Sequence, residues 1–169
     1  YMPTKGNHGL DMMLRSCTSQ VNLDYSSEMD MVKKLRLSFL LQPVATALFS
    51  NSPFSENSLN GFRSYRSEVW RDTDPDRTGI LTFIFDDDMS YERYVNYAME
   101  VPMYFINRNG EYINLTGYTF DDFINRRIEV VKDFYPTIDD WELHLTTIFP
   151  EARLKKFIEM RGADAGNIN

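Results

Sequence analysis

The sequence predicts an α+β fold in which an antiparallel sheet is flanked by helices. Strand-like and helix-like stretches are mixed along the chain and do not alternate as regular βαβ units. Residues 101–115 read as a β-hairpin, because Asn109-Gly110 can form a two-residue turn of type I′. Two distant segments, 17–25 and 155–164, alternate polar and apolar residues, as half-exposed antiparallel strands do. We expect residues 1–169 to form a single domain.

The first half of the chain contains one strand and one long helix. Residues 17–25 form the strand, with apolar and polar side chains on opposite faces. Ser26 or Ser27 then caps a helix with acidic residues in its first turn. Pro43 is expected to kink or divide this helix, and a second helical segment continues to about Phe49. The expected buried stripe of the helix consists of Val32, Leu35, Phe39 and Leu40.

The second half alternates between irregular and regular stretches. Residues 50–62 and most of 63–79 are predicted to be loops because of their polar and charged composition. A short strand is expected at 80–85, and a helix at 90–100. Two further helices follow at 119–128, capped by Thr119, and at 138–149. The final strand begins near residue 155 and is expected to break at Gly162.

Composition narrows the classes of function. The chain has 169 residues, 43% of them hydrophobic, and a formal net charge of −7. This charge argues against nucleic acid or an anionic membrane surface as the main partner. No apolar run approaches the roughly 18 residues of a membrane span. The single cysteine, Cys17, suits a reducing compartment, so the sequence predicts a cytoplasmic protein.

Two predicted strands carry residues suited to a metal-bound phosphate. Magnesium prefers oxygen ligands, and the phosphate charge calls for arginine or lysine. Gln20, Asn22 and Asp24 alternate along the first strand, while Glu159 and Arg161 share one face of the last. Each pattern is also typical of a solvated strand face or a surface ion pair, so neither is specific by itself.

An arginine-rich segment is the second candidate. Four arginines fall within fifteen residues of an acidic chain, beside Trp70; they are Arg63, Arg66, Arg71 and Arg77. A guanidinium binds carboxylate or phosphate oxygens bidentately, so such a segment suits a pocket for an anion. A plain charged loop is the alternative. The sequence contains neither His/Cys spacing typical of zinc nor a glycine-rich phosphate loop.

Several ordered blocks resemble one enzyme family. They are "GLDMM" (9–13), "QVNLD" (20–24), "ATALF" (45–49), "DRTG" (76–79), "VPMYF" (101–105) and "RLKKFIEMRGAD" (153–164). Together they closely resemble the glutamate–cysteine ligases of the plant and proteobacterial type, from Tyr1 to about Gly166. Members of that family are much longer, so the chain is expected to be an internal segment of a catalytic domain and inactive alone.

The resemblance implies a reaction and a set of roles. ATP phosphorylates the side-chain carboxylate of glutamate, and the amine of cysteine displaces phosphate, with Mg²⁺ as cofactor. The implied fold is a cup-shaped antiparallel sheet similar to that of glutamine synthetase. The implied roles are metal binding by Glu159 and Gln20, nucleotide binding by Asn22 and Arg161, catalysis by Arg161 and Arg77, and substrate binding by Arg66, Trp70, Tyr25 and Tyr104.

The resemblance leaves two alternatives open. A related ligase could join glutamate to an amine other than cysteine, since only the acceptor pocket would differ. A catalytically inactive binding module of the same fold is the second alternative. The expected partners are glutamate, cysteine, ATP and the remainder of the same catalytic domain, with neither nucleic acid nor a membrane among them.

Overall fold

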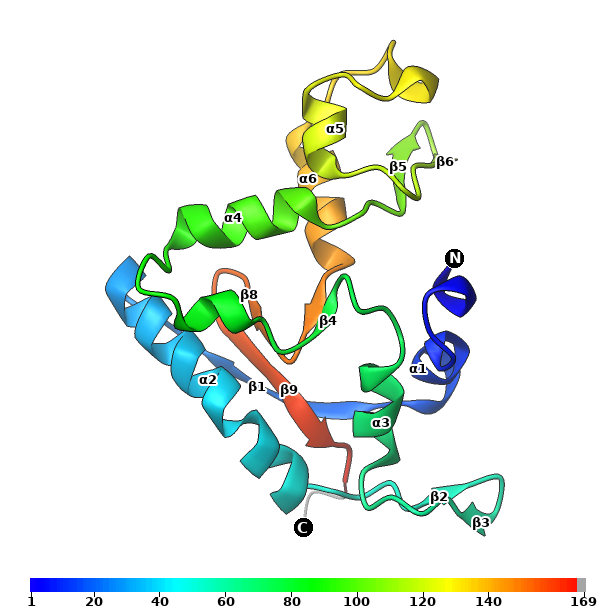
Figure 1. Cartoon of the computed structure of the whole chain (residues 1–169), viewed down its shortest axis with the longest axis vertical. Helices are drawn as coiled ribbons and strands as arrows, with labels where there is room; N and C mark the ends of the chain where they lie inside the picture. The colour runs from blue at the N-terminus through cyan, green and yellow to red at the C-terminus, as the bar shows by residue number, and fades with distance from the viewer. Residues whose placement is uncertain (167–169) are drawn as a thin grey trace. The chain divides into compact units, whose positions relative to one another are not determined.

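The computed structural model describes residues 1–166 and contains two compact units (Figure 1). Among the described residues, the first unit comprises 1–89 and 149–166, and the second comprises Ser90–Ile148. The elements of the first unit are η1 (Met2–Thr4), α1 (Gly9–Arg15), β1 (Thr18–Leu23), α2 (Glu28–Leu48), β2 (Phe54–Ser55), β3 (Ser58–Leu59), α3 (Tyr65–Arg71), β4 (Thr78–Gly79), η2 (Thr82–Phe85), β7 (Phe149–Pro150), β8 (Ala152–Leu154) and β9 (Ile158–Asp164). Those of the second are α4 (Tyr91–Glu100), β5 (Phe105–Arg108), β6 (Glu111–Asn114), α5 (Phe120–Ile124), η3 (Glu129–Val131) and α6 (Ile138–Thr146).

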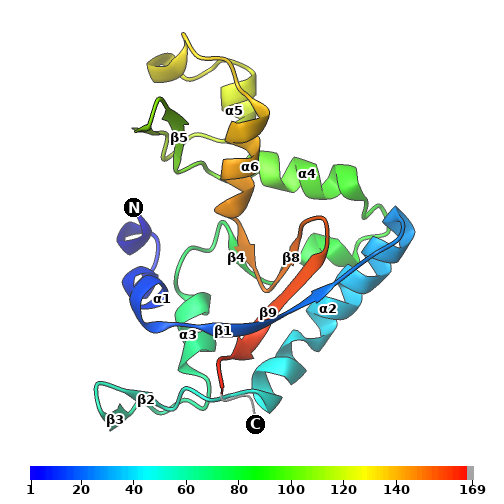
Figure 2. The same ribbon diagram turned by 180° about the vertical axis from the view of Figure 1, so that it is seen from behind.

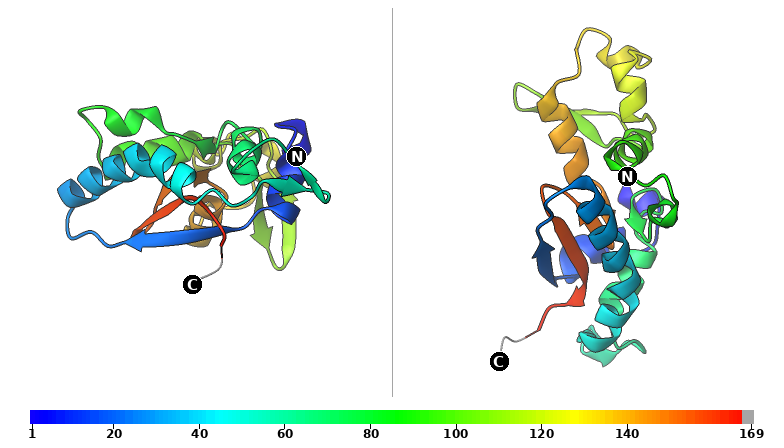
Figure 3. Two further views of the ribbon diagram at one scale, coloured as in Figure 1. Left: turned by 90° about the horizontal axis from the view of Figure 1, so that it is seen from below. Right: turned by 90° about the vertical axis from the view of Figure 1, so that its left-hand side faces the viewer.

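An antiparallel sheet of order β1–β9–β8 forms the framework of the first unit. The view from behind shows β1 lying beside β9, with α2 running along the sheet (Figure 2), and the side views place α2 on one face (Figure 3). β2 and β3 form a separate short hairpin, whereas β4 and β7 pair in parallel over two residues. The mixture of helices with small antiparallel sheets confirms the α+β class.

Helix α2 begins where the sequence predicts but does not divide at Pro43. The Ser27 side chain accepts a hydrogen bond from the amide of Asp30, as an N-cap does. Of the two predicted outcomes, a kink or a division, the division is wrong because Pro43 lies inside one continuous helix; the kink stays a prediction. α2 packs on β9 and β8, and these contacts stabilise the helix despite the missing amide of Pro43. Leu40, expected in the buried stripe, is 62% exposed, because the covered face consists of Met31, Leu35, Ser38, Phe39 and Gln42.

The predicted break at Gly162 is also wrong, because β9 continues to Asp164. The glycine serves close packing instead. A Cβ atom at this position would lie 2.1 Å from Oε1 of Gln42 and 3.2 Å from Oγ1 of Thr46, both on α2. The Thr46 hydroxyl donates to the carbonyl of Gly162 at 3.2 Å. Gly162 therefore brings helix and strand together rather than ending the strand.

Two further predictions in the first unit fail. The stretch 63–79 contains helix α3, whose N-cap Ser64 accepts a hydrogen bond from the amide of Ser67. The predicted strand at 80–85 is mostly the 3-10 helix η2. Ile84 is fully buried there, and its carbonyl accepts a hydrogen bond from Nε of Arg36 at 2.9 Å. A short apolar run suits a buried turn as well as a strand, so the sequence pattern could not separate them.

The second unit contains the predicted hairpin and helices, but α5 ends at Ile124 rather than at 128 and α6 ends at Thr146 rather than at 149. Asn109 and Gly110 have φ values of 55° and 89°, as a type I′ turn between β5 and β6 requires. Helices α5 and α6 both begin with capping boxes, at Thr119 and Thr137. Its main apolar core consists of Met103, Ile106, Leu115, Phe120, Phe123, Ile128 and Val131. Within residues 1–166, no helix is long and apolar enough to cross a membrane.

The N-terminal segment is held against the loop after α3 at Gly6. A Cβ atom on Gly6 would lie 2.3 Å from the carbonyl oxygen of Asp72 and 2.7 Å from that of Thr73. We expect Gly6→Ala to destabilise this contact by about 1–3 kcal/mol, because backbone atoms cannot give way. Hydrogen exchange of residues 1–15 in the full-length protein should therefore become faster. Gly166→Ala is the control, since its Cβ would meet only Nδ2 of Asn51 at 3.6 Å; equal exchange in both variants would contradict the clash.

Candidate functional site

Polar residues from three strands form a row across the main sheet. Asn22 of β1 lies opposite Glu159 of β9, and Glu159 lies opposite Arg153 of β8. Side chains of directly opposed residues share a face of the sheet. The register shifts between Ser19 and Val21, which places Gln20 at the irregularity. The structure thus makes neighbours of the two strands that the sequence singled out.

Glu159 is the centre of an ion-pair cluster. Its carboxylate lies 2.7 Å from Nε of Arg153, 2.8 Å from Nζ of Lys155 and 3.4 Å from Nη1 of Arg161. Glu159 is 5% exposed. Burial raises the pKa of its carboxyl, but hydrogen bonds from Arg153 and Lys155 outweigh burial, so the pKa lies below its ordinary value. The carboxylate therefore stays ionised and pairs with the buried guanidinium of Arg161.

Trp70 of α3 contacts two buried guanidinium groups. The Cζ atoms of Arg66 and Arg161 each lie 5.5 Å from the centre of the indole ring, a distance typical of cation–π contacts. Burial lowers the pKa of both arginines. Phe149 meets the same indole edge-on, with 5.8 Å between ring centres. Strand and helix thus bring together Arg66, Trp70 and Arg161, three residues that the sequence predicted for the site.

Glu151, which sequence reasoning missed, lies near the charges of Arg66 and Arg161. Burial raises the pKa of its carboxyl, and the charges of Arg66 and Arg161 counter that rise. The amide of Arg161 donates to the carbonyl of Glu151 at 3.1 Å. Its position in the block "FPEARLK" offered no sign of this role, because the contact depends on tertiary structure.

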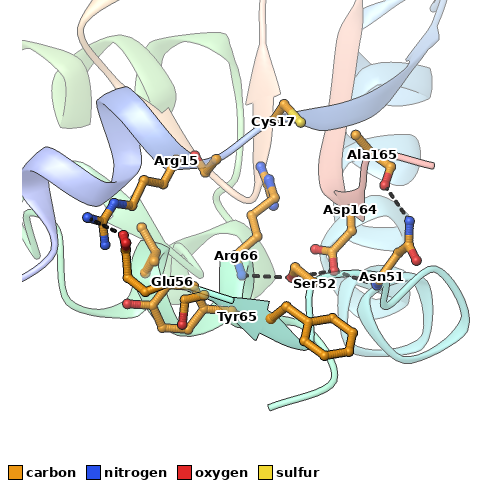
Figure 4. A pocket seen from close by; sticks show the side chains of 13 residues that line it. Arg15, Cys17, Asn51, Ser52, Glu56, Tyr65, Arg66, Asp164 and Ala165 are labelled. Carbon is orange, nitrogen blue, oxygen red and sulfur yellow. Dashed lines mark hydrogen bonds and ion pairs between the residues drawn. The ribbon is translucent and has the colours of Figure 1, made fainter. Parts of the chain in front are cut away.

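Arg66 lines a pocket of about 290 Å³ within the first unit (Figure 4). Its neighbours there include Cys17, Ser52, Tyr65 and Asp164. Arg66 is 5% exposed, and its Nε has no hydrogen-bond partner among residues 1–166. A buried guanidinium without such a partner is costly, so the pocket is suited to an anionic group that supplies acceptor oxygens.

Other predicted site residues lie elsewhere. Arg77 is fully buried and pairs with Asp74, with 2.8 Å between Nε and Oδ2. The hydroxyl of Tyr25 donates to the carbonyl of Lys155 at 2.6 Å, next to the β8–β9 turn. Tyr104 belongs to the second unit, where its carbonyl accepts a hydrogen bond from Leu115 at 3.0 Å. Their predicted roles stay predictions.

The described residues do not make up a metal site by themselves. Residues 1–166 contain no group of three or more His, Cys, Asp or Glu side chains arranged to hold a metal ion. Both oxygens of Glu159 already meet cations. Gln20 and Asn22 could add only neutral amide oxygens, and Mg²⁺ sites in proteins use carboxylates and phosphates.

Comparison with known proteins points to one family. A family model described as glutamate–cysteine ligase family 2 matches residues 1–168. The chain is 60% identical over 166 residues to the chloroplastic glutamate–cysteine ligase of Brassica juncea, and 58% identical to those of Medicago truncatula and Arabidopsis thaliana. Each match covers 98% of this chain, but only 32% or 33% of the relative. The chain thus spans about a third of the length of these curated relatives.

The prediction of a cytoplasmic protein is contradicted. The relatives from Brassica juncea, Solanum lycopersicum and Arabidopsis thaliana are all named chloroplastic. A single cysteine indicates at most a reducing environment and does not distinguish one such compartment from another.

Proposed function

The chain belongs to glutamate–cysteine ligase family 2, and we propose that the protein containing it joins the side-chain carboxylate of glutamate to the amine of cysteine. ATP would activate the carboxylate as an acyl phosphate, from which the amine displaces phosphate. This reaction is the first step of glutathione synthesis. The names of the relatives favour a plastid location for the whole protein.

The observation that carries this proposal is the buried Arg66 guanidinium, which lines the pocket and whose Nε lacks a hydrogen-bond partner within residues 1–166. A carboxylate of an amino-acid substrate would supply the oxygen acceptors that Arg66 lacks. Trp70 packs against the guanidinium and limits its movement. Binding would then place a negative charge next to a buried guanidinium at the pocket, which favours substrates that carry a carboxylate.

Arg161 is proposed to meet the transferring phosphoryl group. Such a group passes through a transition state with negative charge on its peripheral oxygens, and a fixed cation nearby stabilises that charge. Glu159 and Trp70 both contact the Arg161 guanidinium, so little reorganisation would accompany the reaction. Asn22, in the same row as Glu159, is proposed to contact the nucleotide.

Magnesium would neutralise phosphate charge when bound. Residues 1–166 alone do not fit the ion, because Glu159 is already paired with cations. Metal binding by Glu159 and Gln20 is therefore proposed only together with ligands from the remainder of the protein. The same remainder would complete the cup-shaped sheet to which β1, β9 and β8 are proposed to belong.

The carboxylate role is tested by Arg66→Ala in the full-length protein. We expect the KM for an amino-acid substrate to rise roughly 100-fold, because a buried, bidentate charge pair is lost. The KM for ATP should change little. Arg71→Ala is the matched control on the same helix, since Arg71 is largely exposed and pairs with Glu68 at 3.3 Å. Unchanged affinities for both amino acids in Arg66→Ala would overturn the proposed role.

One assay identifies the amine acceptor and distinguishes the proposed ligase from the two alternatives, a related ligase with another amine and an inactive binding module. ATP turnover of the full-length protein is measured with glutamate and a panel of amines, cysteine among them. A clear preference for cysteine supports glutamate–cysteine ligation, and a preference for another amine supports a related ligase. Absence of turnover with every amine, despite nucleotide binding, would favour an inactive module.

A further inference from the structure

We propose that Asp164 is a positioning residue that fixes helix α3, and with it Arg66, for substrate binding. This inference rests on the proposed carboxylate role of Arg66. Asp164 is the last residue of β9 and is 5% exposed. It lines the same pocket as Arg66 (Figure 4).

The Asp164 carboxylate accepts three short hydrogen bonds. Its Oδ2 accepts from the amide of Asn51 at 2.6 Å and from the hydroxyl of Ser52 at 2.7 Å. Its Oδ1 accepts from the hydroxyl of Ser64 at 2.8 Å. Hydrogen bonds to a charged acceptor are stronger than those between neutral groups. A single side chain therefore joins the end of β9 to the loop before β2 and to the start of α3.

Both hydroxyls in turn hold the first turn of α3. The Ser52 hydroxyl accepts a hydrogen bond from the amide of Arg66 at 3.1 Å. The Ser64 hydroxyl accepts from the amide of Ser67 at 3.1 Å, as the N-cap of the helix. Because each hydroxyl donates its only hydrogen to Asp164, its lone pairs are directed at these amides. Asp164 thus fixes the backbone from which Arg66 extends.

The role is one of hydrogen-bonding geometry rather than of ion pairing. Within residues 1–166, no salt bridge reaches the Asp164 carboxylate, whose three partners are a backbone amide and two hydroxyls. Its charge acts on Arg66 only from a distance, where it favours the charged guanidinium. The two effects can be separated, because asparagine keeps one acceptor oxygen in place while removing the charge.

The experiment compares Asp164→Ala and Asp164→Asn in the full-length protein. For Asp164→Ala we expect the KM of the carboxylate substrate bound by Arg66 to rise about tenfold or more, because three buried hydrogen bonds are lost. The KM for ATP should stay within about twofold, since uniform damage to the fold would move both constants. Asp164→Asn should raise this KM less than Asp164→Ala does, because an acceptor oxygen remains for Asn51 and Ser52 although the Ser64 hydroxyl loses its acceptor. Asp87→Ala, an exposed aspartate in the same unit, is the control.

Hydrogen exchange of residues 64–71 supplies a readout independent of activity. It should become faster in Asp164→Ala and change less in Asp164→Asn, which loses only the acceptor for Ser64. If Asp164→Ala folds poorly, Ser52→Ala is the second variant, because it removes only the hydrogen bonds that run through the Ser52 hydroxyl. It should raise the KM and the exchange rate in the same direction but by less. Normal exchange and a normal KM in Asp164→Ala would overturn the proposal, as would equal effects of the alanine and asparagine variants.

The same data distinguish failure of the proposed function. If Arg66→Ala leaves the KM unchanged, the carboxylate role of Arg66 is wrong, whereas exchange of residues 64–71 still shows whether Asp164 fixes α3. If both roles are right, Asp164→Ala should add little to the KM of Arg66→Ala, because one residue acts through the other. Fully additive effects of the two changes would contradict positioning.

Discussion

In the full-length protein, Glu159→Gln is expected to lower the rate of ATP-dependent ligation by roughly 100-fold. The neutral amide keeps the size of the side chain but cannot balance the charges of Arg153, Lys155 and Arg161. Its amino group would also face one of these cations. Arg161 would then lose the carboxylate that holds it beside Trp70, and the charge proposed to meet the phosphoryl group would be displaced.

The measurement is steady-state kinetics at saturating glutamate and cysteine, with Glu92→Gln as an exposed control from the same chain. Titration with Mg²⁺ separates the two proposed functions of Glu159. If the carboxylate also binds metal, the Mg²⁺ concentration for half-maximal activity should rise in Glu159→Gln. If it only holds Arg161, that concentration should stay the same while the rate falls. Wild-type turnover would show that Glu159 takes no part in the reaction.

Much of this candidate site could be predicted from local sequence patterns. The polar alternation of 17–25 predicts β1, and the pattern "FIEMR" places Glu159 and Arg161 on one face of β9. Those patterns depend only on the two-residue period of a strand. Helix caps such as Ser27 and Thr119 are local as well, and both are where the sequence predicts them.

The sequence predictions that failed concern a short helix and contacts between distant segments of the chain. Helix α3 has only seven residues, too few for a clear helical period in a highly charged stretch. The hydrogen bonds of Asp164 reach back 112 residues to Ser52 and 100 residues to Ser64, so no local pattern reports them. Gly162 illustrates the same limit, because its function as a packing site depends on Gln42 of α2.

The second large effect is expected for Asp74→Ala, which should lower the free energy of unfolding by about 3–5 kcal/mol. Asp74 and Arg77 are both fully buried, and their side chains meet at 2.8 Å. Removing the carboxylate takes away the charge that meets a fully buried guanidinium at 2.8 Å. The Asp74 carboxylate also accepts the amide of Asp76 at 3.1 Å, so the turn before β4 loses a second contact.

Urea unfolding of the full-length protein measures this effect, and Asp76→Ala is its matched control. Asp76 lies two residues away in the same turn and forms an ion pair with Lys5 at 2.7 Å. The side chains of both residues are about one-third exposed. Such a pair contributes about 1 kcal/mol or less, so the two variants should differ clearly. The comparison also tests the predicted catalytic role of Arg77. If Asp74→Ala leaves the urea midpoint unchanged but abolishes ligation, the ion pair acts in the chemistry. If stability falls as expected and the remaining folded protein keeps its kcat, the ion pair maintains the fold and the reaction does not need it.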